Sequence, residues 1–149
     1  MKLKIKAMSP KMGNEIPLPF YASPGAAAMD LCACMDEAVT IAPGEIVSLP
    51  AGVAIALPSA EYAALVFARS GLGIKHGIAL ANGVGVIDSD YRGEIRVGLV
   101  NQSRQPYTVQ PGDRIAQLAV VPVVQAALEV ADTLEDTDRG DGGFGSTGR

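Results

Sequence analysis

Short runs of apolar residues, separated by turn-forming residues, recur along most of the chain. Val and Ile are frequent within the runs, which are bounded at close intervals by 17 Gly and 10 Pro. Short apolar runs with such boundaries predict β-strands. The runs lie at residues 40–46, 52–57, 62–67, 77–81, 94–101 and 114–121. The alanine clusters at 26–28 and 63–64 are too short to sustain a helix, and we expect at most one helical turn, at residues 58–61.

Two six-residue segments resemble each other. Residues 40–45 are Thr-Ile-Ala-Pro-Gly-Glu, and residues 108–113 are Thr-Val-Gln-Pro-Gly-Asp. In each segment Pro can fix φ at the second position of a type II turn, and Gly can accept the positive φ of the third. Two similar strand–turn–strand units in one chain predict an all-β fold, a jelly-roll-like distorted β-barrel.

The composition narrows the class of protein. The chain has 149 residues, the size of one domain, with 48% hydrophobic and 19% charged residues, which is typical of a globular fold. Its net charge is −4 and it has no long run of Lys or Arg, so we expect no nucleic-acid partner. Without a secretory pattern or a spanning apolar stretch, we expect no membrane association and a cytoplasmic location. Cys32 and Cys34, the two cysteines, are interpreted as reduced structural thiols.

The composition changes near residue 132. Residues 132–138 contain four acidic side chains, and five of the residues 139–149 are Gly. We therefore divide the chain into a barrel at residues 1–131 and an acidic linker with a Gly-rich tail at 132–149. A tail of this kind can be a frayed end. It also carries an aromatic ring, two hydroxyls and two arginines, which could close over a base and its phosphates as a flexible lid.

Two segments between these ends can carry chemistry. Residues 82–101 combine an extended run, a turn-like stretch and an alternating strand, which predicts a β-hairpin with Asp88 and Asp90 flanking its bend. Ordinary turn carboxylates are the alternative interpretation. The tripeptide Arg69-Ser70-Gly71 follows an apolar strand and can offer a charge, a hydroxyl and backbone N–H groups to an anion. A surface turn is the simpler explanation for the tripeptide alone.

Taken together, five segments in order resemble the motifs of the trimeric dUTPase family. They are GAAAMDLCA at 25–33, ARSGLGIKHGI at 68–78, ANGVGVIDSDYRGEIRVGLVN at 81–101, PGDRIAQL at 111–118 and RGDGGFGSTG at 139–148. The resemblance extends from about residue 20 to the C-terminus. Mild departures are Ala28, Ala68 and Gly73, where the family often has Gly, Pro and Ala.

The resemblance implies hydrolysis of dUTP to dUMP and pyrophosphate, with the third motif forming the uracil pocket. The pocket residues that it implies are Asn82, Val86, Ile87, Asp88 and Arg96. Tyr91 is expected against the deoxyribose, where it would exclude a 2′-hydroxyl. Asp88 is the expected general base for the attacking water, and Asp90 is interpreted as structural.

The resemblance also implies how the phosphates are held. The implied phosphate and lid residues are Arg69, Ser70, Gly71, Gln117, Arg139, Phe144, Gly145, Ser146 and Thr147, with Phe144 stacking on uracil. Mg²⁺ is the expected cofactor, held mainly by phosphate oxygens and water, and Asp30 would contact it indirectly. The resemblance further implies a homotrimer whose sites are shared between subunits. A dCTP deaminase-like enzyme, a non-catalytic dUTP-binding regulator and a jelly-roll module without a small ligand are the alternatives.

Overall fold

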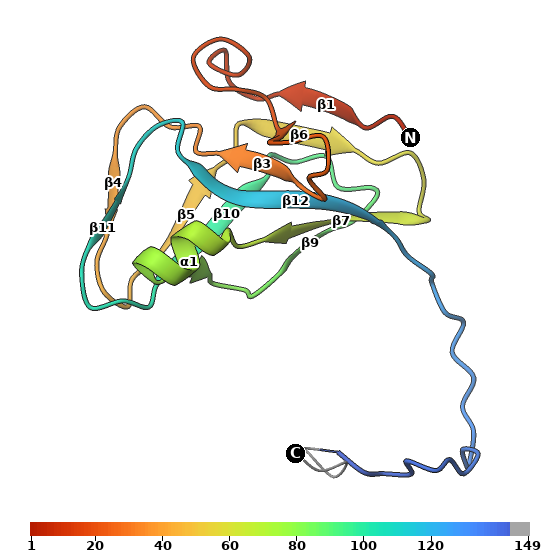
Figure 1. Ribbon diagram of the computed structural model, residues 1–149. Coiled ribbons are helices and arrows are strands. Elements are labelled where there is room, and N and C mark those ends of the chain that lie inside the picture. Colours follow the sequence, from red (N-terminus) through yellow and green to blue (C-terminus); the bar gives the residue numbers. More distant parts are fainter. Residues whose placement is uncertain (144–149) are drawn as a thin grey trace.

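The computed structural model describes residues 1–143, and within this range the chain forms twelve short strands and one short helix (Figure 1). The elements are β1 (Lys4–Ala7), β2 (Phe20–Tyr21), β3 (Met29–Cys32), β4 (Val39–Ile41), β5 (Ile46–Pro50), β6 (Val53–Ala56), β7 (Tyr62–Phe67), α1 (Ser70–His76), β8 (Ile78–Leu80), β9 (Gly85–Ile87), β10 (Arg96–Asn101), β11 (Tyr107–Val109) and β12 (Arg114–Pro122). The prediction of an all-β, jelly-roll-like fold is confirmed.

The strands form four small antiparallel sheets rather than one continuous barrel wall. Their orders are β2-β3-β12-β7-β9, β5-β10-β8, β11-β4 and β1-β6. Most of the apolar side chains that these sheets bury belong to one hydrophobic cluster, which includes Leu31 and Leu118 of the five-stranded sheet and Val97 and Leu99 of the three-stranded sheet. The sheets are therefore layers around a common core, as expected for a jelly roll.

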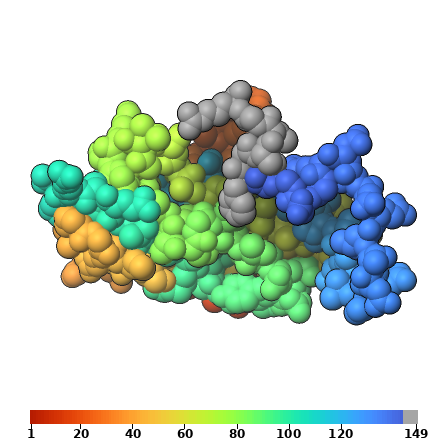
Figure 2. Space-filling model, turned by 90° about the horizontal axis from the view of Figure 1, so that it is seen from below, coloured from red at the N-terminus to blue at the C-terminus, as the bar shows by residue number. Residues whose placement is uncertain are grey.

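The two resembling segments lie face to face. β4 pairs with β11 so that Thr40 is opposite Thr108, and their hydroxyls are 2.8 Å apart. Gly44 and Gly112 have φ of 78° and 84°, the positive values that the third position of a type II turn requires. Figures 1 and 2 both show this strand pair side by side at one end of the molecule. The turns inferred from the sequence are confirmed.

The helix forms at a different place from the one expected. Residues 58–61 make only a turn, with the Tyr62 N–H donating to the Ser59 carbonyl, whereas α1 occupies Ser70–His76. Gly77 ends α1 in the left-handed conformation, with φ 67° and ψ 22°. Two glycines within α1 lower its intrinsic helix propensity, so burial of Leu72 and this C-cap decide its formation. Gly77 after Lys75 and His76 is a local signal for a helix end, whereas the burial of Leu72 depends on tertiary packing.

The predicted hairpin at residues 82–101 is wrong. β9 pairs with β7 at the edge of the five-stranded sheet, whereas β10 pairs with β5 and β8 in the centre of the three-stranded sheet. Residues 88–95 therefore form a loop that crosses from one sheet to the other. The sequence predicts that these two neighbouring strands pair with each other, but each pairs with strands elsewhere in the chain. The crossing leaves a gap between β9 and β10 that a hairpin would have closed.

The chain after β12 contains no strand or helix up to residue 143. It leaves the body of the molecule as an extended segment, drawn in blue in Figure 1. Val124, Leu128, Val130 and Leu134 in this segment are at least 90% exposed. We call residues 123–143 the arm. The division of the chain at residue 131 stays a prediction.

Candidate functional site

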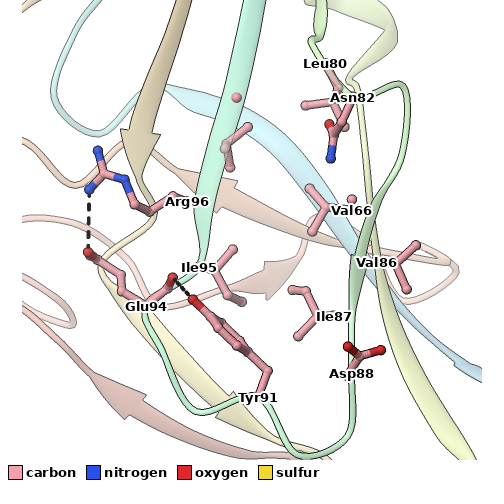
Figure 3. A pocket seen from close by; sticks show the side chains of 13 residues that line it. Val66, Leu80, Asn82, Val86, Ile87, Asp88, Tyr91, Glu94, Ile95 and Arg96 are labelled. Atoms are coloured by element: carbon pink, nitrogen blue, oxygen red, sulfur yellow. Dashed lines mark hydrogen bonds and ion pairs between the residues drawn. The ribbon is translucent and has the colours of Figure 1, made fainter.

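A pocket of about 290 Å³, which we call the junction pocket, lies between β9 and β10 (Figure 3). Its lining residues are Val66, Leu80, Asn82, Gly85, Val86, Ile87, Asp88, Tyr91, Glu94, Ile95, Arg96, Val97 and Gly98. The pocket exists because the two strands belong to different sheets. Six residues implied by the family resemblance, among them Asn82 and Asp88, thus meet in one pocket.

The junction pocket has main-chain groups along one wall. β9 is the last strand of its sheet and is paired with β7 on one side, so its other edge keeps N–H and C=O groups that no strand uses. β10, on the opposite wall, is paired with β5 from Arg96 to Val100, and with β8 only from Leu99 to Asn101. A planar ligand with its own donors and acceptors can therefore hydrogen-bond to the edge of β9.

Asp88 follows β9 directly and is exposed at the rim of the pocket. Its main-chain carbonyl accepts a hydrogen bond of 3.2 Å from the N–H of Tyr91, which turns the chain at this point. Asp90 lies two residues further along the loop, is also exposed, and does not line the pocket. The structure therefore separates the two carboxylates, because Asp88 lines the pocket and Asp90 does not.

Tyr91 stands at one end of the pocket and Asn82 at the other (Figure 3). The Tyr91 hydroxyl donates a hydrogen bond of 3.0 Å to the main-chain carbonyl of Glu94. Arg96 lines the pocket, but its guanidinium is directed away from it. Its Nε and one terminal nitrogen donate to Oγ and the carbonyl oxygen of Ser48 at 3.1 and 2.7 Å. The charge of Arg96 is thus used to fix β10 against β5.

A second cavity, of about 470 Å³, contains the arginine of the Arg-Ser-Gly segment, and we call it the arginine cavity. Its lining residues are Ala22, Ala26, Ala27, Ala28, Asp30, Phe67, Arg69, Ser70, Arg114, Gln117 and Ala119. Ser70 and Gly71 form the first turn of α1, where backbone N–H groups have no acceptor within the helix. Gln117 Nε2 donates to the Ala68 carbonyl at 3.1 Å. The cavity can therefore offer several donors to an anion.

Asp30 is the buried charge of the arginine cavity. One carboxylate oxygen accepts from Arg69 Nε at 2.9 Å, and the other from an Arg114 terminal nitrogen at 3.0 Å. The Asp30 side chain is 8% exposed, whereas those of Arg69 and Arg114 are 24% and 47% exposed. One carboxylate thus aligns two guanidinium groups and leaves the group with a net positive charge. Burial, reinforced by the Asp30 carboxylate, raises the pKa of the neighbouring Cys32 thiol.

Sequence reasoning did not identify Arg114 as a site residue. It lies in the PGDR segment, immediately after the second Pro-Gly turn and at the first position of β12. That position was a usable signal, because a cation at the start of a strand next to a turn is close to solvent. Its partnership with Asp30, 84 positions earlier, depends on the pairing of β3 with β12.

The two cavities of one chain share no lining residue. β7 contributes Val66 to the junction pocket and the next residue, Phe67, to the arginine cavity. Successive side chains of a strand point to opposite faces, so β7 separates the two. A single chain therefore does not bring Arg69 and Asp88 to one site.

Arg139 lies on the arm and is exposed, with its Nε donating to the Gly142 carbonyl at 3.0 Å. Arg139 lines neither the junction pocket nor the arginine cavity. Phe144, Gly145, Ser146 and Thr147 lie outside the described residues, so their proposed roles stay predictions. Within residues 1–143 no helix has the length and apolarity to cross a bilayer. In the same range no three His, Cys, Asp or Glu side chains group as metal ligands.

Comparison with known proteins identifies a family and relatives that this chain resembles over most of its length. The family model described as dUTPase matches residues 14–148. Proteins called deoxyuridine 5'-triphosphate nucleotidohydrolase from Idiomarina loihiensis and Enterobacter sp. are each 49% identical over 148 residues, covering 99% of this chain and 98% and 97% of theirs.

Solved structures agree in fold. A mutant dUTPase of Staphylococcus bacteriophage 80alpha with dUpNHpp has a TM-score of 0.86 at 24% identity, covering 99% of both chains. A mutant dUTPase from phage phi11 of S. aureus, described with a structural Mg(II) ion, has a TM-score of 0.78 at 21% identity and covers 91% of this chain and 100% of that one. The family match and the relatives cover nearly the whole chain, and this chain belongs to the dUTPase family.

Proposed function

We propose that this chain is a dUTP diphosphatase, which hydrolyses dUTP to dUMP and pyrophosphate by attack of water on the α-phosphorus. The observation that carries the proposal is the exposed Asp88 carboxylate at the rim of the junction pocket, in a member of the dUTPase family. The reaction supplies dUMP for dTMP synthesis and keeps uracil out of DNA. The cytoplasmic location stays a prediction from the sequence.

The free edge of β9 supports binding of the base in the junction pocket. Main-chain groups near Val86 and Ile87 would pair with the polar edge of uracil, and they need no side-chain ordering to do so. The position of Tyr91 at one end of the pocket supports its contact with the deoxyribose. A 2′-hydroxyl would meet the ring there, so UTP is rejected.

Asp88 acts as general base in this proposal. Its carboxylate is exposed and therefore reachable by water, and the turn through Tyr91 fixes the backbone that carries it. A carboxylate in this position withdraws a proton from the attacking water as the bond to phosphorus forms. The leaving pyrophosphate then carries the growing negative charge, which the cationic groups of the site offset.

The arginine cavity of a second copy supplies the phosphate-binding groups. Arg69, Ser70, Gly71 and Gln117 would contact the triphosphate, because donors on a guanidinium, a hydroxyl, the first turn of a helix and an amide suit phosphate oxygens. Within one chain these groups lie on the other side of β7 from Asp88. A complete site thus requires two chains.

A homotrimer with shared sites is the assembly that we propose. The apolar side chains of the arm support association of copies, since Val124, Leu128, Val130 and Leu134 are at least 90% exposed in a single chain. Burying such side chains against another copy would remove an unfavourable contact with water. The arm and the residues that follow it would then bring Arg139 and Phe144 to a site, where they close over the phosphates and the base.

Mg²⁺ is the proposed cofactor. The donors present suit a metal held by the substrate, because both Asp30 oxygens already accept hydrogen bonds from guanidinium groups and no cluster of ligating side chains occurs within residues 1–143. When bound, Mg²⁺ would neutralise part of the triphosphate charge. An indirect contact of Asp30 with its hydration shell stays a prediction.

The reaction is tested by incubating the protein with dUTP, dCTP, UTP or dTTP in Mg²⁺ and following pyrophosphate and ammonia. We expect pyrophosphate from dUTP alone. Ammonia from dCTP would identify a deaminase, and dUTP binding without turnover would identify a regulator. The Asp88→Asn variant should bind dUTP and lose about 10²–10⁴-fold in kcat, the usual contribution of a general base. Asp90→Asn is the matched control and should retain activity.

The shared site is tested by mixing two inactive variants. Asp88→Asn and Arg69→Ala subunits, co-expressed and purified as mixed oligomers, should regain part of the activity. Some of their sites combine an intact Asp88 from one chain with an intact Arg69 from the other. If each site were built from one chain, mixing would restore nothing.

A further inference from the structure

Gly93 occupies the loop that carries Tyr91, and the space that its missing side chain would fill is taken by the Tyr91 ring. A Cβ atom built on Gly93 would lie 2.3 Å from the Tyr91 hydroxyl oxygen, 2.6 Å from Cζ and 3.0 Å from Cε2. These separations are too short for a real contact. Gly93 is not among the glycines with positive φ, so its backbone conformation is open to other residues. The Tyr91 ring, and not the backbone conformation, is therefore what a side chain at residue 93 would meet.

The acceptor of the Tyr91 hydroxyl is held firmly. Glu94, whose carbonyl accepts that hydrogen bond, also uses Oε1 to accept from the Gly52 N–H at 3.1 Å. The next residue, Ile95, donates to the Val53 carbonyl at 2.8 Å and accepts from the Ala51 N–H at 2.9 Å. Because these bonds hold its acceptor in place, the Tyr91 hydroxyl keeps the ring over Gly93.

We propose that Gly93 is a positioning residue for sugar specificity, because its lack of a side chain lets Tyr91 fold back and form the sugar end of the junction pocket. The inference rests on the proposed contact between Tyr91 and the deoxyribose. A side chain at residue 93 would push the ring outward. Tyr91 is 46% exposed, so the ring can move into solvent while the backbone stays in place. The pocket would then open at the end where a 2′-hydroxyl is excluded.

The experiment compares Gly93→Ala with Tyr91→Ala, with the double variant and with Gly73→Ala as the control. Gly73 also lies outside the positive-φ set, and a Cβ there would meet its nearest atom, the Ile78 carbonyl oxygen, at 3.8 Å, an ordinary contact. For each protein kcat/KM is measured with dUTP and with UTP, and the ratio of the two values is the specificity. The ring itself is followed by ¹⁹F NMR of fluorotyrosine-labelled protein, with Tyr91→Phe assigning the resonance among the four tyrosines.

We expect Gly93→Ala to reduce the dUTP-to-UTP ratio by about tenfold or more, and to shift the Tyr91 resonance while leaving the other three in place. The control should change neither. Adding Gly93→Ala to Tyr91→Ala should change the ratio and the melting temperature no further, because the group that the new methyl meets is gone. This lack of additivity distinguishes positioning through Tyr91 from a general structural role.

Two results would overturn the inference in different ways. If Tyr91→Ala lowers the ratio and Gly93→Ala does not, Tyr91 governs sugar specificity without help from Gly93. If neither variant lowers the ratio, the proposed sugar contact of Tyr91 is itself wrong, and the inference fails with it. An additive loss in the double variant, or an unmoved Tyr91 resonance, would also refute it.

Discussion

Replacing Asp30 by Asn tests whether one buried carboxylate organises the arginine cavity. The substitution keeps the size of the side chain and removes the charge that two guanidinium groups share. The amide oxygen can still accept one of the two hydrogen bonds. Its NH₂ group then faces the N–H groups of the other arginine, donor against donor. Either Arg69 or Arg114 must therefore leave its position.

The size of the effect follows from burial. Removing one partner of a fully buried ion pair costs about 3–5 kcal/mol. The side chains of Arg69 and Arg114 are 24% and 47% exposed, so water can solvate the released guanidinium and reduce the cost. We expect the variant to lose about 2–3 kcal/mol of unfolding free energy, below the fully buried range. A misplaced Arg69 should also lower kcat/KM for dUTP by about tenfold, or ~1.4 kcal/mol.

Urea unfolding and steady-state kinetics with dUTP measure the two effects. Asp36→Asn is the matched control, because Asp36 pairs with Lys11 at 2.6 Å but its side chain is 87% exposed. Loss of that surface pair should leave both the unfolding midpoint and kcat/KM unchanged. If Asp30→Asn behaves like this control, the carboxylate does not organise the two arginines and the reasoning is wrong.

Three further predictions concern the core and the tail. Gly52→Ala should lower the free energy of unfolding by about 2–4 kcal/mol, because φ there is +70° and the new Cβ would lie 2.6 Å from Cys34 atoms. Gly44→Ala is the control for the cost of positive φ alone, since its φ is similar and no atom lies within 4 Å of the new Cβ. Equal urea midpoints for the two variants would contradict the packing argument. Burial raises the pKa of Cys32 above its ordinary 9.0, so the stability from its neutral thiol is present below pH 9 and is lost as pH rises through the higher folded value. Urea midpoints between pH 7 and 10.5 measure this loss of stability, and the rate of reaction with a thiol reagent measures the accessibility of the thiol. Fast labelling of the native protein would disprove burial. Deleting residues from Arg139 onward should leave the oligomer intact by light scattering and abolish most turnover, whereas a fully active truncation would eliminate the lid.

The sequence predicted those features that local chemistry determines. The Pro-Gly turns at residues 43–44 and 111–112 followed from the backbone preferences of two residue types, and most strands followed from apolar runs. Pairing partners did not follow. β9 and β10 are neighbours in sequence and were expected to form a hairpin, but their partners are set by the packing of whole sheets.

The residues of the candidate site also fall into those that the sequence predicted and those that it did not. Asn82, Asp88 and Tyr91 were found because they lie in one continuous motif, and the structure gathers them in one pocket. Arg114 was missed because its importance comes from Asp30, which only the β3–β12 pairing brings near it. Its place after a turn marks Arg114 as close to solvent, but a pairing between residues 84 positions apart cannot be read from a single sequence.

The loop at residues 88–95 has a mechanical consequence. It tethers two sheets whose hydrogen-bond ladders are otherwise separate, so the width of the junction pocket changes whenever the sheets move against each other. A nucleotide bound between β9 and β10 would contact both sheets and restrict their relative movement. Ligand should therefore slow amide hydrogen exchange in both layers together, including strands that never touch it, because opening either layer would first require the ligand to leave.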